Sequence, residues 1–153
     1  MSPIIQRTDF PHLHPLSSRW QDNDLNGHIA SATVYGFFDS AIQAYLIEQA
    51  GIDPQDGKVV GFVVSSACDF YASAAFPDLL QIGLRVERLA GSSVEYVLAL
   101  FQVGQEQPCA VGRVVQVFVE RYSGQPAVLP TRLQAALEAL HGEARSDLNP
   151  TPS

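Results

Sequence analysis

Two aspartates and a histidine, Asp22, Asp24 and His28, lie within seven residues near the start of the 153-residue chain. A carboxylate can act as a general base or nucleophile in acyl transfer, and a histidine titrates near neutral pH. Apolar residues at helical spacing follow from Ala32, so this loop leads into a helix N-terminus. Unpaired amides at such an end suit a developing oxyanion. The pattern is compatible with acyl transfer, although turn capping by both aspartates and packing of His28 would also explain it.

The elements that hold this loop can be delimited from the sequence. Asn26 and Gly27 tolerate left-handed backbone and indicate a tight turn. The helix is expected from about residue 32 to residue 50, with Ser31 as its N-cap and Gly51 as its C-terminal cap. Its expected buried face comprises Val34, Phe37, Phe38, Ala41, Tyr45 and Leu46.

The segment from residue 59 to residue 122 is predicted to be all strand, in four runs rich in β-branched and aromatic residues. The breaks FPD, AGSS and GQEQP have the length of hairpin turns. A short strand is expected at 18–21, and a short amphipathic helix after Pro130. The predicted fold class is α+β, a long central helix wrapped by a five- to six-stranded antiparallel sheet. We expect one domain over residues 1–142 and a disordered C-terminal tail over residues 143–153.

Composition excludes several classes of partner. Nine basic and sixteen acidic residues give a net charge of −7, and Lys58 is the single lysine, which argues against nucleic acid and anionic membranes. The N-terminus has no signal-peptide pattern and no apolar run could span a bilayer, so a cytoplasmic location is expected. Cys68 and Cys109 stand apart inside apolar runs, which indicates two free buried thiols.

The last predicted strand is apolar on both sides, with Val115, Val117 and Val119 on one and Val114 and Phe118 on the other. A sheet of this kind needs cover on both faces. Because one long helix covers only one face, we expect a homodimer or homotetramer in which a partner subunit covers the other.

The run R-W-x-D-x-D-x-x-G-H-I, followed by an aromatic-rich helix containing F-F-D, resembles the hotdog-fold acyl-CoA thioesterases of the 4-hydroxybenzoyl-CoA thioesterase type. The resemblance covers about residues 15–140. The residues in register with the family pattern are Asp24, Gly27, His28, Phe38 and Asp39. Two positions depart from it: Ala30-Ser31 replaces a frequent Asn-Asn pair, and Val34 takes the place of a tyrosine, with Tyr35 beside it.

The resemblance implies a hotdog fold and a catalytic carboxylate at Asp24, which either attacks the thioester carbonyl or activates a water. It places the amide that polarises the carbonyl on Ser31, and implies a coenzyme A thioester as substrate with no cofactor. The supporting residues would be Asn26, Gly27, His28 and Tyr35. His28 would fix the loop by hydrogen bonding or act as the general base, and Asp22 would cap the turn or pair with Arg19.

The phosphates of coenzyme A require local cations, and Arg88, Arg113 and Arg121 on the later strands are candidates, unless they are ordinary solvated strand residues. Ser65 and Ser66 could line a pocket or be core hydroxyls bonded to backbone. His12 and His14 match no zinc signature, so no metal site is predicted.

Three functions compete on these observations. The leading hypothesis is an acyl-CoA thioesterase, which yields a carboxylic acid and free coenzyme A. A hotdog dehydratase or hydratase would resemble a pattern around N-P-x-H, which this chain lacks. A non-catalytic acyl-thioester binding protein of the same fold remains an alternative because the Asn-Asn pair is missing.

Overall fold

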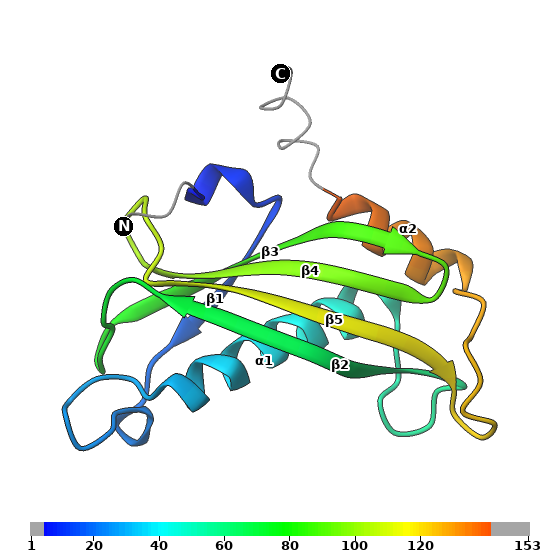
Figure 1. Ribbon diagram of the computed structural model, residues 1–153, viewed down its shortest axis with the longest axis horizontal. Helices are drawn as coiled ribbons and strands as arrows, with labels where there is room; N and C mark the ends of the chain where they lie inside the picture. Colours follow the sequence, from blue (N-terminus) through cyan, green and yellow to red (C-terminus); the bar gives the residue numbers. More distant parts are fainter. Residues whose placement is uncertain (1–4, 142–153) are drawn as a thin grey trace.

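The longest element is α1 (Ser31–Ala50), which lies across one face of a five-stranded antiparallel sheet (Figure 1). The computed structural model describes residues 5–141. The sheet order is β1-β3-β4-β5-β2, so β1 and β2 form its two edges. Its strands are β1 (His12–Ser17), β2 (Val59–Phe70), β3 (Leu79–Ala90), β4 (Ser93–Gln102) and β5 (Ala110–Glu120). The remaining elements are α2 (Thr131–Ala139) and two short 3₁₀ helices, η1 (Arg7–Asp9) and η2 (Trp20–Asp22).

The predicted helices and the four long strands are confirmed, and the region before α1 is corrected. Gly51 ends α1 with φ +69°, the left-handed conformation expected of a C-terminal cap. The N-cap is Ala30, and Ser31 is the first helical residue rather than the cap. The strand expected at 18–21 is wrong: β1 ends at Ser17 and η2 follows. The chain turns there because the Asp22 carboxylate accepts the Arg19 backbone N–H at 2.7 Å.

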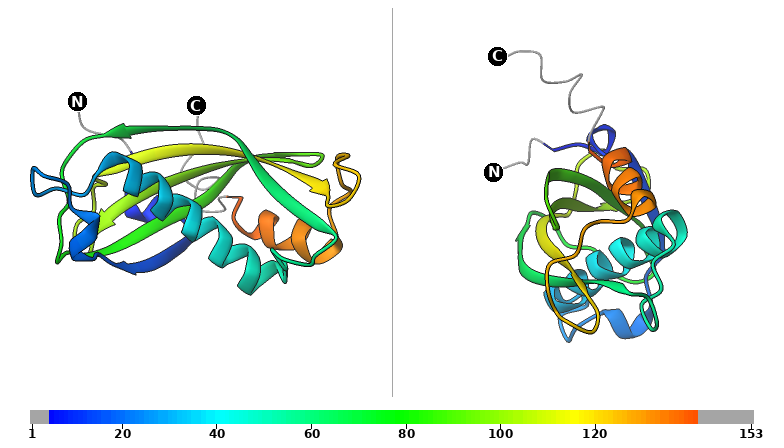
Figure 2. Two further views of the ribbon diagram at one scale, coloured as in Figure 1. Left: turned by 90° about the horizontal axis from the view of Figure 1, so that it is seen from below. Right: turned by 90° about the vertical axis from the view of Figure 1, so that its right-hand side faces the viewer.

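The core lies between the sheet and the two helices, on the face we call the inner face. All six apolar residues of the predicted α1 face are buried. Phe38 fits against β5 at Gly112, where an added Cβ would come within 2.6 Å of its ring. The Tyr45 hydroxyl donates to the Ala136 carbonyl at 2.6 Å, which ties α1 to α2. Figure 2 shows the sheet curving around α1, with β1 and β2 on either side of the helix.

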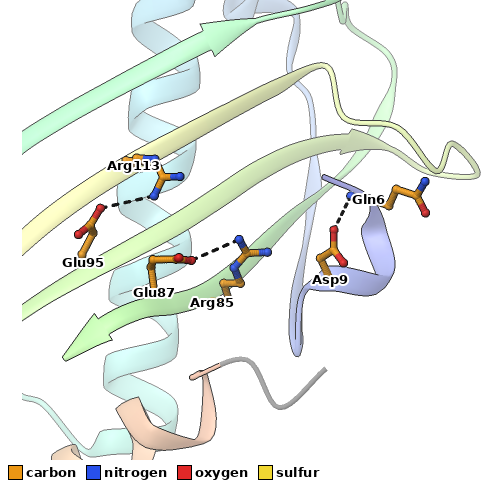
Figure 3. A network of polar contacts seen from close by, with 6 residues as sticks. All are labelled: Gln6, Asp9, Arg85, Glu87, Glu95 and Arg113. Carbon is orange, nitrogen blue, oxygen red and sulfur yellow. Dashed lines mark hydrogen bonds and ion pairs between the residues drawn. The ribbon is translucent and has the colours of Figure 1, made fainter. Parts of the chain in front are cut away.

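The opposite, outer face is covered over one part by the N-terminal segment. Phe10 packs edge-on against Phe101 in a small cluster with Val97 and Ala99, and it lies over Gly83, which has no side chain. The expectation that a partner must cover this whole face is therefore corrected for that part. The remaining part of the outer face carries polar contacts, among them those of Arg113 with Glu95 and of Arg85 with Glu87 (Figure 3).

The edge strand β2 exposes large apolar side chains and contains an irregularity between Val63 and Ser65. Its exposed apolar residues, with those just beyond its end, are Phe62, Val63, Val64, Phe70 and Tyr71. Neither helix of the described chain is long and apolar enough to cross a membrane. The predicted tail, residues 143–153, lies outside the described residues.

Candidate active site

The predicted turn between η2 and α1 is closed by main-chain hydrogen bonds. Asp24 N donates to the His28 carbonyl at 2.7 Å, and Gly27 N donates to the Asp24 carbonyl at 3.1 Å. Gly27 has φ +81°, a left-handed conformation that favours glycine. The turn that Asn26 and Gly27 predicted is thus confirmed.

The Asp24 side chain is held by this turn and remains exposed. Its Oδ1 accepts the backbone N–H of Asn26 at 2.8 Å and that of His28 at 3.3 Å. The other carboxylate oxygen of Asp24, Oδ2, accepts no hydrogen bond from any group within residues 5–141. One carboxylate oxygen therefore fixes the orientation, and the other is free to meet a water or a carbonyl carbon.

His28 contributes to the loop through its backbone rather than its imidazole. Its N–H and carbonyl both bond to Asp24, whereas the ring makes no hydrogen bond within the described chain. His28 also lines a cavity beside the start of α1. His28 thus holds the loop by hydrogen bonding, as expected, but through its main chain, and a role of the ring in proton transfer stays a prediction.

The cavity beside His28 has a volume of about 330 Å³ and lies between the loop, the first turn of α1 and the end of β2. No side chain caps α1, so the amides of Ser31 and Ala32 have no intrahelical acceptor, as in the first turn of any α-helix. Ser31 lines the cavity, which puts the partial positive charge of the helix end at its wall. The lining comprises His28, Ile29, Ser31, Val34, Leu100, Ala110 and residues 70–74.

Two hydrogen bonds attach the loop to the segment that follows β2. Ile29 N donates to the Ala74 carbonyl at 2.8 Å, and Phe76 N donates to Asn23 Oδ1 at 2.9 Å. Residues 70–74 form a cavity wall that sequence reasoning missed. The only signal was the run of small residues Ala72-Ser73-Ala74 after a strand, and nothing in that run says which loop it will meet.

Asp22 is structural in its contacts. Its side chain is 1% exposed, and Oδ1 accepts Arg19 Nη2 at 2.9 Å. This hydrogen bond raises the pKa of the Arg19 guanidinium, and the negative charge of Asp22 adds to the effect. The carboxylate both caps η2 and pairs with Arg19, which joins the two roles predicted for it.

A second hollow of about 440 Å³ lies between α1 and the edge strand β2. Tyr35, Asp39 and Gln43 project into it from positions i, i+4 and i+8 of one helix face. Ser66 lines its strand side, together with Gly61, Val63 and Val114. Tyr35 therefore lines this second hollow and not the cavity at Ser31, which is lined by Val34 instead.

The two serines predicted as a pocket-lining pair are separated. Ser66 faces Val114 across the ladder on the inner side, whereas Ser65 pairs with Val115 on the outer side. Successive residues of a strand point to opposite faces, so the two cannot line one pocket. Ser66 lines the second hollow, and its role in substrate binding stays a prediction.

The three arginines predicted to bind phosphate do not reach the cavity in the protomer. Arg113 lies on the outer face, 3.4 Å from Glu95 (Figure 3). Arg88 is exposed and faces Glu95 on the same side of the sheet. Arg121 follows β5 at the far end and donates through Nε to the Gly57 carbonyl at 2.6 Å. The side chain of Arg121 is thus turned to the loop that precedes β2.

Over residues 5–141, no group of three or more His, Cys, Asp and Glu side chains is arranged to hold a metal ion. His12 stacks edge-on against Tyr45, with ring centroids 5.0 Å apart. Cys68 and Cys109 are both free, as predicted, but only Cys109 is buried, and Cys68 on the edge strand β2 is half-buried. Burial, with a smaller contribution from Asp69, raises the pKa of the Cys68 thiol to about 11, so this thiol is a poor nucleophile at neutral pH.

Comparison with solved structures places this geometry among known proteins. The protein PA5185 from Pseudomonas aeruginosa strain PAO1 is 51% identical, with a TM-score of 0.90 over 92% of this chain and 99% of its own. A thioesterase from Thermus thermophilus, solved with coenzyme A and Zn, is 27% identical with a TM-score of 0.70 over 86% and 95%. A 1,4-dihydroxy-2-naphthoyl-CoA thioesterase from Synechocystis is 19% identical with a TM-score of 0.73 over 82% and 93%, a likeness of fold.

The amino-acid sequence also assigns the chain to a family. The profile of the thioesterase-like superfamily matches residues 18–137, which include the loop, α1, the four long strands and most of α2. The long helix wrapped by an antiparallel sheet is the hotdog fold expected from the resemblance. The chain therefore belongs to the thioesterase-like superfamily and has the hotdog fold of its thioesterases.

Proposed function

We propose that this protein is an acyl-CoA thioesterase in which Asp24 is the catalytic carboxylate and the Ser31 amide polarises the thioester carbonyl. The observation that carries the proposal is the cavity between the uncapped N-terminus of α1 and His28, whose backbone N–H donates to the Asp24 carboxylate at 3.3 Å. Asp24 itself is not among the residues that line this cavity in the protomer. The coenzyme A bound to the Thermus thermophilus thioesterase supports a coenzyme A thioester as the substrate class.

In the proposed reaction the thioester and water give a carboxylic acid and free coenzyme A. The carbonyl oxygen accepts the Ser31 N–H, and its developing charge is stabilised by the helix end. Asp24 either takes a proton from the attacking water, or attacks the carbonyl carbon to form an anhydride that water then opens. In both routes the C–S bond breaks and the leaving sulfur takes up a proton. Neither route requires a cofactor.

We further propose that two copies pair along β2. This edge strand exposes Phe62 and Val64 at 56% and 60%, an apolar edge that soluble monomers avoid. Twofold pairing extends the sheet, and places the end of β2, which walls the cavity, at the interface. Sedimentation of a dilute sample tests this, since an active species at the 16.6 kDa monomer mass would contradict it.

A non-catalytic acyl-thioester binding protein is the second candidate. It is favoured by Ala30-Ser31, which replaces the frequent Asn-Asn pair of the family pattern, and by the bonding of Asp24 Oδ1 to its own loop. Such a protein would bind acyl-CoA at the same cavity without releasing thiol.

The deciding experiment is a thiol-release assay on a panel of aliphatic and aromatic acyl-CoAs, paired with direct measurement of acyl-CoA binding. Release above that of the Asp24→Asn variant supports hydrolysis. Binding without release on every substrate favours the binding protein. The protein's own Cys68 contributes little background to the thiol-release signal near neutral pH because its pKa is about 11.

We also propose a cytoplasmic location, which the two free thiols support because disulfides are rare in that compartment.

A further inference from the structure

The phosphates of a coenzyme A thioester need cations, and most cations of the described chain are already engaged. Arg19, Arg85 and Arg113 contact carboxylates. Arg7 is bound by Gln81 and by two carbonyls, and Arg132 donates to carbonyls at the end of α1. Among the lysine and arginine side chains of residues 5–141, only those of Lys58 and Arg88 make neither an ion pair nor a hydrogen bond.

Lys58 lies beside a hollow of about 460 Å³ at the far end of the molecule from Asp24. Arg121 N donates to the Lys58 carbonyl at 2.7 Å, so the two cations are cross-strand neighbours. Arg121 donates its Nε and Nη2 to the carbonyls of Gly57 and Pro54, and its charge contributes to lowering the pKa of the nearby Asp53 carboxyl. Its contacts within 4 Å in the described chain include no carboxylate, so part of its charge remains available to an anion. The other lining residues are Val59, Glu120, Tyr122, Ser123, Ala127 and Val128.

The rest of the hollow suits an aromatic base. Tyr122 and Val128 both line the hollow and are 89% and 92% exposed, so their apolar surfaces are open to a ligand. The turn is held by Glu120 N donating to the Gln125 carbonyl at 2.8 Å, and by Ala127 N donating to the Phe118 carbonyl at 3.0 Å. The single carboxylate of the lining, that of Glu120, accepts the Ser123 hydroxyl at 2.9 Å. Two cations beside an exposed aromatic ring match a nucleotide that carries phosphates.

Lys58 and Val59, which line this hollow, lie at the start of β2. In one protomer the loop between η2 and α1 lies near the other end of that strand (Figure 1). Antiparallel pairing of two β2 strands brings the first residues of one strand against the last residues of the other. Pairing centred on the middle of the strand sets Lys58 opposite the partner's Tyr71, and Tyr71 lines the Ser31 cavity. The neighbouring strands are then about 5 Å apart.

We propose that Lys58, Arg121 and Tyr122 bind the nucleotide end of the coenzyme A thioester that is hydrolysed at the Asp24 site of the partner subunit. Lys58 and Arg121 neutralise its phosphates, and Tyr122 stacks on the adenine. This inference rests on the proposed function and on the proposed β2 pairing. In the resulting dimer, each protomer supplies the catalytic loop of one active site and the nucleotide-binding hollow of the other active site.

The nucleotide site is tested without catalysis by titrating adenosine 3′,5′-bisphosphate into the wild type and three variants. Lys58→Gln should weaken binding about tenfold, as expected for the loss of a charged partner. Tyr122→Ala should weaken it several-fold, and Arg88→Gln, which removes the other unengaged cation, should leave it unchanged. No binding to the wild type, or equal binding by all four proteins, would overturn the proposal.

The partner's contribution is tested by co-expressing Asp24→Asn and Lys58→Gln chains with different tags. In the mixed dimer one site carries both changes and the other carries neither, so about half of the wild-type rate at low acyl-CoA should return. If the hollow served its own chain, each site would carry one change and the rate would not recover.

Hydrolysis of the same acyl group on N-acetylcysteamine, which lacks the nucleotide, separates the two proposals. The Lys58→Gln variant should match the wild type on this thioester while its KM for acyl-CoA rises about tenfold. A wild type that hydrolyses neither thioester would refute the proposed function, and the bisphosphate titration would still decide the nucleotide site.

Discussion

The two faces of the sheet use the same strands for different purposes. The inner face is a continuous apolar core under α1 and α2, and it opens at the loop between η2 and α1 into the candidate active site. The outer face carries a small cluster around Phe10 and the ion pair of Arg113 with Glu95. Residues one position apart, such as Ser65 and Ser66, fall on different sides of this division.

The difference shows that position on a strand, more than residue type, decides whether a side chain can take part in chemistry. An arginine or serine on the outer face has the right functional group but no access to the cavity. If this comparison holds, substitutions at the inner-face loop change the rate or stability strongly, and matched substitutions on the outer face change little.

The largest effect is expected from Asp24→Asn. The amide is nearly isosteric and can still accept the Asn26 N–H, so the turn should persist. It is neither a good base nor a good nucleophile, and the hydrolysis rate should fall by about 10²–10⁴-fold. The rate is measured by thiol release, with folding checked by circular dichroism and thermal unfolding. A folded variant within a few-fold of the wild type would remove Asp24 from the catalytic role.

A smaller effect, on stability, is expected from Asp22→Asn. The change removes the charge from a side chain that is 1% exposed and accepts two hydrogen bonds from Arg19. The free energy of unfolding should fall by about 1–3 kcal/mol, with the rate within a few-fold of the wild type. Denaturant titration and the thiol-release assay measure the two. Loss of activity here, together with retention in Asp24→Asn, would reverse the roles of the two aspartates.

The stability of the protein should depend on pH through His12, which lies on β1 against Tyr45. Burial lowers the pKa of His12 below its usual 6.5, the charge of His14 lowers it further, and Glu48 opposes both. The unfolded chain therefore binds the proton more readily, and stability is lost as the pH falls from about 6.5 through the folded pKa. Denaturant titrations at several pH values should show this slope reduced in His12→Phe, which keeps a ring against Tyr45. An unchanged slope would show that His12 does not titrate in this way.

The smallest effect is expected from Arg113→Gln on the outer face. Its ion pair with Glu95 is 53% and 33% exposed at the two side chains, and exposed pairs contribute at most about 1 kcal/mol. The rate of thiol release and the KM for acyl-CoA should stay within about twofold of the wild type. A large rise in KM would show that the outer face reaches substrate, and the comparison of the two faces would fail.

Local sequence was sufficient for the two α-helices, the four long strands and the loop. Gly51 predicted the end of α1 because only a left-handed residue continues the chain there, and Asn26-Gly27 predicted the turn for a similar reason. The buried face of α1 followed from a spacing of apolar residues that matches 3.6 residues per turn. The short strand at 18–21 failed because the Asp22 carboxylate, just past the end of that segment, turned the backbone into η2.

The sequence by itself thus determined the helices, the four long strands and the family, because these depend on contacts between near neighbours or on a motif carried by a few adjacent residues. Tertiary structure alone decided which distant residues surround the Asp24 loop. Residues 70–74 reach the loop because β2 pairs with β5 at the sheet edge, a contact between strands some fifty residues apart. Arg113 and Ser65 face away because the register of that pairing fixes the side on which each one points. Strand order and register are set by the packing of the whole core, which no local pattern encodes.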